Sequence, residues 1–561
     1  MLIKKKRIRR LGMILLIILL VVCGLAAAFR FATHLTPPFI ADTRSLSLKV
    51  EEPDPGLYTL GNSWLKRSRS GLWEMYLEGS PFERGVINGK LSSGLIYTQE
   101  DAFVGELRKI VPSGFYRGLL KYFIYWFNRD IDQYIPEEYK EEIYGISFAA
   151  SDRFSFIGSG YQRLLNYHSA HDIGHALQDL RLVGCTSFGV WSDMSRNGHL
   201  LIGRNFDFYV GDEFARNKIV CIEKPDSGHA FLMITWGGMA GAVSGMNDQG
   251  LTVTINAAKS AIPWSARTPI SIVAREILQY ASDIGEAMAI AKKRETFVSE
   301  SILIGSARDH RAAILEKSPY RTVLVEPKGD YIICANHFQS PEFLADPLNR
   351  KDMKENASVY RYRKVLEDLT REEPLDVAGM ATILRDRSGL NGADIGNGNE
   401  KAINQLIAHH SVIFDASAGK VWISTGPWQE GTYVCYDLFK IIHTFAGLRK
   451  NREITEPELT LPPDTFIKTL EFSQFMKFRE LRTKVADFVR SGKPDHPGGI
   501  PIRELIRSNP QYFGTYELAG DYYGKLNRPD SAACYYRRAL GKVIPRESDR
   551  ERIIRKLVQS N

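Results

Sequence analysis

Several common catalytic signatures are absent from this chain of 561 residues. It has no glycine-rich phosphate loop, so nothing in the sequence indicates a nucleotide-dependent enzyme. It has no GxSxG elbow either, which argues against an α/β-hydrolase. The histidine-rich stretch YHSAHDIGHALQ lacks the central glutamate of an HExxH zinc motif.

Cysteine is scarce and is not arranged in pairs. One cysteine lies in the apolar N-terminal run, and five lie in the rest of the chain. That odd number, with no CxxC spacing, excludes a regular disulfide framework and leaves at least one thiol free. The six positions are Cys23, Cys185, Cys221, Cys334, Cys435 and Cys534.

Positive charge is concentrated at the start of the chain. The formal net charge is +8, and residues 1–10 contain six Lys or Arg and no acid. The remainder is therefore close to neutral, which excludes the basic surface of a nucleic-acid-binding protein. Residues 11–29 then carry no charge at all, and about 20 apolar residues span a bilayer as a helix.

The position of the basic run predicts that the chain after Phe29 lies outside the cytoplasm, in the periplasm of a bacterial cell. Two interpretations of residues 11–29 remain, an uncleaved anchor or a signal peptide cut near Ala26-Ala27-Ala28. We favour the anchor, because the apolar run is long for a signal. A lipoprotein signal at Cys23 is disfavoured, because Val22 is bulky where a small residue is expected.

The pattern along the rest of the chain predicts several regions. From Trp73 to residue 184 the pattern is mixed, with helices expected at 118–128 and after Pro136. Short β-rich runs separated by Gly, Asn and Asp follow, with two helices among them, which predicts two antiparallel sheets covered by helices. The expected regions are a basic segment (1–10), an anchor or signal (11–29), an irregular spacer (30–72), a pro-segment (73–184), a catalytic region (185–440), a helical linker (441–494) and a helical tail (495–561). The tail resembles one tetratricopeptide-like helix pair, or is a plain helical hairpin, and is a candidate site for a protein partner.

The stretch LVGCTSFGVW places Cys185 directly after a glycine. If the Gly184–Cys185 bond is cut, Cys185 carries both a thiol and an α-amine whose pKa is about 7.7–8.0, so the amine can act as the base for its own thiol. Gly184 suits this junction because glycine tolerates backbone geometries that other residues do not. We therefore expect Gly184–Cys185 to be the site of self-cleavage.

The segment LLIGRNFDF supplies two charged candidates, Arg204 and Asp207. A guanidinium near a thiol favours the thiolate, and a carboxylate can orient an α-ammonium group. Residues three apart on a strand point to opposite faces, so both reach Cys185 only if the chain bends there. The alternative is an ordinary ion pair at the end of a strand.

The segment CTSFGVWSDMSRNGHLLIGRNFDF resembles the nucleophile region of N-terminal-nucleophile (Ntn) hydrolases, specifically the isopenicillin N acyltransferase family and the related choloylglycine hydrolases. GSPFERGVINGKL, GMNDQGLTVTINA, CANHF, SVYRYRKVLEDL and VIFDASAGKVWISTGP follow in family order, so the resemblance covers roughly residues 75–440. It implies an α+β fold, the four-layer αββα Ntn-hydrolase sandwich.

The resemblance also implies further site residues. Asn256 would offer its amide to the developing oxyanion, and Asn336 would bind the α-amine or the intermediate. Arg361 would complete the site and fits better than Arg363, although a slip of one residue in the alignment leaves both open. For the two asparagines, capping of turns or strand ends is the alternative role.

The expected function is that of a self-cleaving cysteine hydrolase. Because 184 residues precede Cys185, exposing the nucleophile requires autoproteolysis. The thiolate would cleave a linear amide in a small molecule through a thioester, with no cofactor. The alternatives are an acyltransferase that passes the acyl group from a thioester or amide to an amine, and an inactive membrane-tethered interaction protein.

A metal site is a competing interpretation of the residues just before the junction. His168, His171 and His175 fall on one helix face with Asp172 beside them, a spacing that can hold zinc. We instead expect these histidines to pack inside the pro-segment, and we predict no metal.

Overall fold

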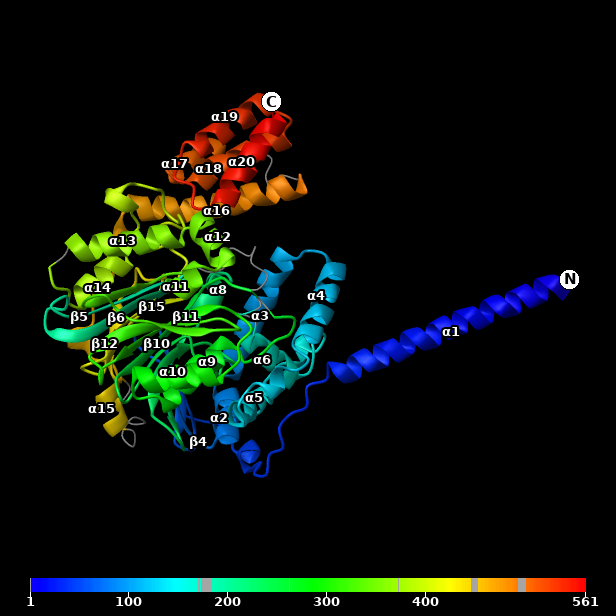
Figure 1. The fold of residues 1–561 in the computed structure, drawn as a ribbon, viewed down its shortest axis with the longest axis horizontal. Coiled ribbons are helices and arrows are strands. Elements are labelled where there is room, and N and C mark those ends of the chain that lie inside the picture. Colours follow the sequence, from blue (N-terminus) through cyan, green and yellow to red (C-terminus); the bar gives the residue numbers. More distant parts are fainter. Residues whose placement is uncertain are drawn as a thin grey trace.

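The computed structural model describes residues 2–169, 172, 184–261, 263–371, 373–444, 453–492 and 501–560. Two β-sheets form the centre of the described chain, with helices on both sides of the pair and a separate group of helices at the C-terminus (Figure 1). The larger sheet has eleven strands, in the order β1 (Glu51–Asp54), β2 (Leu57–Leu60), β3 (Ser63–Arg67), β4 (Trp73–Gly79), β7 (Ile219–Pro225), β8 (Phe231–Thr235), β9 (Ser244–Asn247), β10 (Leu251–Ala257), β11 (Glu300–Ser306), β12 (Arg311–Lys317) and β13 (Thr322–Val325).

The smaller sheet begins one residue after Cys185 and carries the predicted nucleophile region. Its six strands run in the order β14 (Tyr331–Cys334), β5 (Thr186–Ser192), β6 (Gly198–Phe206), β15 (His410–Asp415), β16 (Lys420–Ser424) and β17 (Tyr433–Asp437). All of its pairings are antiparallel in the described chain.

Helices make up most of the remaining described structure. Those before the junction are α1 (Leu2–Ala32), α2 (Pro81–Leu91), α3 (Ser93–Ile110), α4 (Gly114–Phe127), α5 (Glu137–Ser147) and α6 (Gly160–His168). Those between or beside the later strands are α8 (Asp212–Arg216), α9 (Ile270–Tyr280), α10 (Ile284–Lys293), α11 (Pro341–Leu344), α12 (Pro347–Glu355), α13 (Ser358–Arg371), α14 (Val377–Leu384) and α15 (Leu438–His443). The C-terminal ones are α16 (Leu470–Ser491), α17 (Ile502–Ser508), α18 (Phe513–Lys525), α19 (Pro529–Leu540) and α20 (Glu547–Ser560).

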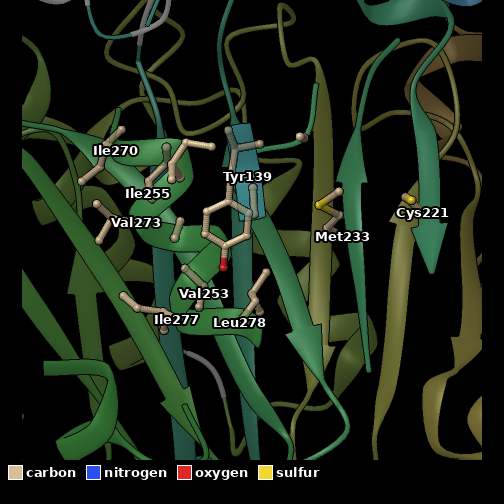
Figure 2. Close-up of a cluster of buried hydrophobic side chains, with 14 of the residues drawn as sticks. Tyr139, Cys221, Met233, Val253, Ile255, Ile270, Val273, Ile277 and Leu278 are labelled. Carbon is tan, nitrogen blue, oxygen red and sulfur yellow. The ribbon is translucent and has the colours of Figure 1, made fainter. Parts of the chain in front are cut away.

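Some strands of the larger sheet, such as β8, carry continuous apolar runs because both of their faces are buried. On β7, Ile219 and Cys221 belong to the cluster that packs against helices, whereas Val220 and Ile222 belong to the cluster between the two sheets. Side chains alternate across a strand, so a continuous apolar run fills two cores at once. Figure 2 shows the helix-facing cluster, in which Val273 and Ile277 of α9 lie near strand residues.

The smaller sheet is covered in the same way. Leu200 and Ile202 of β6 pack between the sheets, and Leu201 packs with Met380 and Leu384 of α14 on the other side. The structure is therefore mixed α/β, with two sheets that share an apolar core.

Two features of the larger sheet differ from the sequence expectation. Residues 51–67 lie in the expected irregular spacer but form β1, β2 and β3, and Trp64 of β3 is fully buried. The turn residues Gly56 and Gly61, both with positive φ, dominate the local pattern and hide these short strands. In addition, β4 pairs with β7 in parallel, so the larger sheet is not wholly antiparallel.

The N-terminal helix α1 extends away from the body (Figure 1). Its segment Arg10–Ala32 is long and apolar enough to cross a membrane, with a mean hydropathy of 3.0 in its most apolar window. In the C-terminal helices, α18 packs against α19, and the next helix, α20, packs against α19. Their buried residues, such as Phe513 and Tyr536, form an apolar cluster of their own.

Candidate active site

The junction between Gly184 and Cys185 leads directly into β5 of the smaller sheet. The backbone N–H of Gly184 donates to the carbonyl oxygen of Asp207 at 3.0 Å, which continues the pairing of β5 with β6. Cys185 is only 1% exposed. The peptide bond predicted to be cleaved is therefore buried and held by the sheet.

The absence of a side chain on Gly184 leaves room for the side-chain amide of Gln405. A Cβ atom built on it would lie 2.6 Å from both Nε2 and Oε1 of Gln405. Its φ is not positive, so the conformational freedom of glycine, which the sequence suggested as the reason, is not what the site uses. Only a residue without a side chain lets Gln405 approach the junction this closely.

Arg204 approaches the thiol from β6. Its Nη2 lies 3.8 Å from Sγ of Cys185, and its Nη1 donates to the carbonyl oxygen of Val243 at 2.6 Å and to the Ser244 hydroxyl. The guanidinium also lies over the ring of Phe206, 4.4 Å from its centroid. A fully buried cation is thus fixed beside Cys185.

Asp207 lies one residue beyond the end of β6. Its carboxylate accepts from Nε2 of Gln405 at 3.3 Å, and no ion pair joins it to Arg204 among the described residues. The alternative of a simple Arg204–Asp207 ion pair therefore does not describe this geometry. Burial raises the pKa of Asp207 to about 7, with Arg361 and Arg204 acting in the opposite direction.

The thiol itself is protonated at neutral pH in the uncut chain. Burial raises the pKa of Cys185 to about 11, Arg204 lowers it, and Asp207 and Glu300 raise it further. A hydrogen bond from the backbone of Asp207 to the sulfur favours the thiolate. The site thus contains groups that would stabilise a thiolate, but burial outweighs them in the uncut chain.

Asn256 and Asn336 connect the two sheets near β5. Asn256 accepts from the Ser187 hydroxyl at 2.8 Å and donates to the carbonyl oxygen of Cys334 at 3.0 Å. Asn336 donates to the carbonyl oxygen of Ala257 at 3.1 Å. In the uncut chain both side-chain amides are bonded to main-chain carbonyl groups.

Arg361 reaches the same strand from α13. Its Nε donates to the Thr186 hydroxyl at 3.2 Å, and its Nη2 donates to Oδ1 of Asn336 at 2.5 Å. Arg363 is exposed on the same helix. Of the two arginines that the sequence left open, the structure places Arg361 in the cluster. The six predicted residues therefore surround the first residues of β5.

Sequence analysis missed two residues of this cluster. Nε2 of Gln405 donates to the carbonyl oxygen of Gly184 at 2.6 Å, from a loop 221 positions along the chain. Glu300, at the start of β11, is fully buried, and burial raises its pKa well above the ordinary value, with Arg204 acting in the opposite direction. No local motif marks either residue, since each is brought in by pairing of distant segments.

A small apolar cavity lies beside the end of β6. Its volume is about 50 Å³, and Phe208, one residue after Asp207, lines it. The aromatic residues Phe214 and Trp236 form one part of the wall, and Phe103 and Tyr167 from the segment before Gly184 form another. The segment preceding the junction therefore helps to shape the surroundings of the site.

The histidine-rich stretch is described only in part. Nδ1–H of His168 donates to the carbonyl oxygen of Leu164 at 2.8 Å, and its Nε2 accepts from the backbone N–H of Ala240 at 2.9 Å. Neither ring nitrogen is then left for a metal. His171 and His175 lie outside the described residues, and in the described part no group of three or more His, Cys, Asp or Glu is arranged to hold a metal ion.

Comparison with known proteins finds a family whose model covers most of the residues of this site. Residues 194–428 match the model of a family described as acyl-coenzyme A:6-aminopenicillanic acid acyl-transferase. The match to this acyl-transferase family extends over less than half of the chain. The resemblance predicted from the sequence is thereby confirmed, and the known activities of the family support an enzyme. The acyl-transferase match includes Arg204, Asp207, Asn256, Asn336 and Arg361 and begins nine residues after Cys185.

Curated relatives are similar over parts of their length. An uncharacterized protein of Archaeoglobus fulgidus is 26% identical over 336 residues, which cover 53% of this chain and 54% of the relative. Protein dcd1B of Dictyostelium discoideum is 24% identical over 190 residues, covering 33% of this chain and 35% of the relative. The chain thus spans about half of the first relative and about a third of the second.

Three solved structures resemble parts of the chain, all with low TM-scores. A Caenorhabditis elegans ortholog of N-acylethanolamine-hydrolyzing acid amidase is 15% identical, covers 42% of this chain and 93% of its own, and gives a TM-score of 0.29. A mutant conjugated bile acid hydrolase from Clostridium perfringens is 11% identical, covers 44% and 90%, and gives 0.31. Penicillin V acylase from Agrobacterium tumefaciens is 15% identical, covers 43% and 83%, and gives 0.30.

Proposed function

We propose that this protein is a cysteine amide hydrolase that activates itself by cleaving the bond between Gly184 and Cys185. The observation that carries the proposal is the arrangement at that bond. The sulfur lies 3.8 Å from the Arg204 guanidinium, and the carbonyl oxygen of Gly184 accepts from Gln405 at 2.6 Å. A nucleophile and an electrophilic carbonyl with a bound donor are adjacent in the chain.

Self-cleavage proceeds by transfer of the acyl group to sulfur. Sγ of Cys185 attacks the carbonyl carbon of Gly184, and the developing negative charge on oxygen is stabilised by the Gln405 amide. The C–N bond then breaks and its nitrogen takes up a proton, leaving Gly184 bound to sulfur as a thioester. Water hydrolyses this thioester, which releases the Gly184 carboxylate and leaves Cys185 with a free thiol and a free α-amine.

The mature enzyme uses the same sulfur on its substrate. The new α-amine accepts the thiol proton, and Arg204 favours the thiolate. The thiolate attacks the carbonyl carbon of a linear amide in a small molecule, the amine leaves with a proton, and water resolves the thioester. Nε of Arg204 and Oδ1 of Asp207 are buried without hydrogen-bond partners, so they are free to bind the α-amine or the substrate.

The side-chain amides of Asn256 and Asn336 are assigned to the oxyanion and to the α-amine or intermediate, and Arg361 holds Asn336 in place. An amine that replaces water at the thioester turns the same site into an acyltransferase. No cofactor is required for either reaction.

We assign the surrounding architecture as follows. The two sheets and their helices form the four-layer αββα sandwich, α1 anchors the protein, and the body lies outside the cytoplasm. The C-terminal helices, whether or not they form a tetratricopeptide-like unit, are a candidate surface for a protein partner. The segments before and after the junction stay associated, because Arg84 and Glu142 of the first form buried ion pairs with Glu223 and Arg275 of the second.

The decisive experiment is the mass of the purified full-length protein and the N-terminal sequence of its fragments. We expect two associated fragments, the second beginning at Cys185, and an uncut chain in Cys185→Ala. Cys435→Ala, at another buried cysteine, is the matched control and should be cut normally. An uncut wild-type chain would support the inactive interaction protein instead, and cleavage of Cys185→Ala at this bond would mean that another protease cuts it.

The reaction class is tested on the processed protein with a panel of N-acyl amides. Release of equal amounts of amine and carboxylate indicates hydrolysis. Formation of a new amide when a second amine is added indicates acyl transfer. Cys185→Ala should be inactive in both assays.

A further inference from the structure

Helix α4 is amphipathic, but its apolar face points to solvent. Arg117 and Lys121 are partly buried and bonded to nearby backbone carbonyl oxygens, Lys121 to that of Phe156 at 2.6 Å. The exposed side chains recur every three or four residues and so form one stripe. They are Phe115 (72% exposed), Tyr116 (64%), Leu119 (51%), Tyr122 (55%), Phe123 (49%) and Trp126 (48%).

We infer that this stripe of α4, defined by these six residues, lies in the outer interfacial region of the bilayer that α1 crosses. Soluble surfaces rarely expose a contiguous apolar patch of several large side chains, and such patches mark membrane or protein contacts. The inference goes beyond the proposed reaction and rests on α1 being the anchor.

The position of the stripe relative to α1 is fixed by direct contacts. Phe29, near the end of α1, packs against Tyr122 with ring centroids 5.7 Å apart and against Trp126 at 6.2 Å. The carbonyl oxygen of Thr33 accepts from the Gln162 amide at 3.1 Å, which holds the end of α1 on the body. In Figure 1, α4 lies beside the end of α1 that joins the body.

The length of the uncharged run sets the depth of these contacts. Residues 11–29 rise by about 28 Å as a helix, close to the roughly 30 Å of a bilayer core. Phe29 therefore reaches the outer edge of that core, and the α4 rings that touch it lie at the same level. Trp and Tyr are the residues enriched at this level of membrane proteins.

The charge of the helix fits a lipid surface. The sequence of α4, GFYRGLLKYFIYWF, has two cations and no acid. Arg129, just beyond it, lies over the ring of Trp126 at 4.6 Å. Cations beside an apolar face are the arrangement of interfacial helices that bind anionic lipid headgroups. A lipid surface therefore fits the stripe better than a second copy of this chain, which would bring identical positive charges together.

Further exposed aromatic side chains flank the helix. The backbone N–H of Ala266 donates to the carbonyl oxygen of Phe127 at 2.9 Å, and Trp264, two residues earlier, is 97% exposed. Phe156, whose carbonyl oxygen holds Lys121, is 55% exposed. Attachment through both α1 and α4 would fix the orientation of the body on the membrane, whereas α1 alone would leave it free to turn.

The test places a fluorescent probe on the stripe of the full-length protein in vesicles of phosphatidylethanolamine and phosphatidylglycerol. The parent chain is Cys23→Ala with Cys185→Ala and Cys534→Ser, in which the three remaining cysteines are buried. An NBD label is attached to Leu119→Cys and, separately, to Phe115→Cys. Val558→Cys, 68% exposed on α20, is the matched control.

We expect nitroxide-labelled lipid to remove most of the emission from the two α4 labels, and aqueous iodide to leave it unchanged. At the control position 558, iodide should quench the label and nitroxide-labelled lipid should leave its emission unchanged. Iodide quenching of the α4 labels, as at position 558, would overturn the inference. Protection from both quenchers would mean that protein covers the stripe, as in a second copy of this chain, and would also overturn it.

The anchor itself is reported separately by a label on native Cys23 in the chain that carries Cys185→Ala and Cys534→Ser. If nitroxide-labelled lipid quenches this label but not those on α4, α1 is inserted and only the inference about α4 fails. If nitroxide-labelled lipid quenches neither the Cys23 label nor the α4 labels, both the assignment of α1 as an anchor and the inference about α4 are wrong. Neither result bears on the chemistry at Cys185, which is read from the fragment masses.

Discussion

The side-chain amide of Gln405 donates to the carbonyl oxygen of Gly184 at 2.6 Å, although the two residues are 221 positions apart in the chain. The same nitrogen lies 3.3 Å from the Asp207 carboxylate. The carbonyl group next to the candidate nucleophile is thus already bonded to a donor in the uncut chain. Two predictions follow from this contact.

Replacing Gln405 should slow self-cleavage. Gln405→Glu keeps the size of the side chain but removes the donor, and loss of one such donor typically lowers a rate by about 10²–10³-fold. The measurement is the rate at which the fragment beginning at Cys185 appears after synthesis of the full chain. Gln249→Glu, at an exposed glutamine, should process at the normal rate. Unchanged cleavage in Gln405→Glu would remove Gln405 from the mechanism.

A methyl group on Gly184 should disturb the same contact. Its carbon would lie 2.6 Å from the Gln405 amide, and overpacking of this kind costs about 1–3 kcal/mol. We expect Gly184→Ala to lower the urea midpoint of unfolding, measured in the uncut Cys185→Ala background. Adding Gln405→Ala should restore that midpoint by removing the clash. If the double replacement is no more stable than Gly184→Ala alone, the clash is not the cause.

The sequence predicted more of the site than of its surroundings. Arg204, Asp207, Asn256, Asn336 and Arg361 occur in motifs that follow family order, and the structure gathers them around β5. Gln405 lies in no such motif, and its contact exists only because a long loop returns to the junction. Local patterns carry information about turns and strands, but not about which distant amide will fill a particular space.

The fold, like the site, was predicted from the sequence only in part. The short β-rich runs after Cys185, separated by Gly, Asn and Asp, predicted strands, and the structure forms strands there. The run at β1–β3 was missed because Pro53, Gly56 and Gly61 interrupt it, yet these strands pair with one another and, through β3, with β4 at the edge of the larger sheet. The apolar pattern near residue 120 predicted a helix, but helical periodicity does not tell whether its apolar face meets a core or a bilayer.

Buried ion pairs should hold the two fragments together after cleavage. Nη2 of Arg275 lies 2.7 Å from Glu223 and 3.5 Å from Glu142, and all three side chains are fully buried. Arg275→Met leaves two carboxylates without that partner, and breaking a buried pair in this way costs about 3–5 kcal/mol.

The readout uses the proposed membrane anchor, helix α1. If α1 holds the fragment before residue 185 on the membrane, the fragment after it should be washed off by less urea in Arg275→Met than in the wild type. Arg490→Met breaks an exposed pair with Asp487 and serves as the control, since such pairs are worth about 0–1 kcal/mol. Equal release from both variants would show that other contacts hold the fragments.

Glu74 should make stability depend on pH. Burial raises its pKa from 4.5 to about 7, although Lys66 and the Tyr436 hydroxyl act in the opposite direction. Because the folded-state pKa lies above the unfolded value, the contribution to stability is complete below pH 4.5 and is lost as pH rises through 7. The free energy of unfolding of the Cys185→Ala chain should therefore fall across this window, by at most about 1.4 kcal/mol per pH unit from this group.

Glu74→Gln should flatten that part of the curve, because a neutral amide does not titrate. Urea unfolding of the full chain in detergent at several pH values measures the slope. Glu458→Gln, at an exposed position, should leave the slope as it is. If Glu74→Gln and the parent chain give parallel curves, Glu74 is not the source.

The C-terminal helices should influence cleavage through the loop that carries Gln405. Phe475 of α16 belongs to one apolar cluster with Leu406, the residue after Gln405, and its ring lies close to Gly398 of the same loop. Phe475→Ala opens a cavity beneath this loop, and such changes cost about 3–5 kcal/mol locally. We expect slower appearance of the fragment beginning at Cys185, because Gln405 is held less firmly. Ile553→Ala removes an equally buried side chain from the separate cluster of α18–α20 and should leave the rate unchanged. Equal slowing in both variants would point to general destabilisation of the tail, and no slowing in either would separate the tail from the junction.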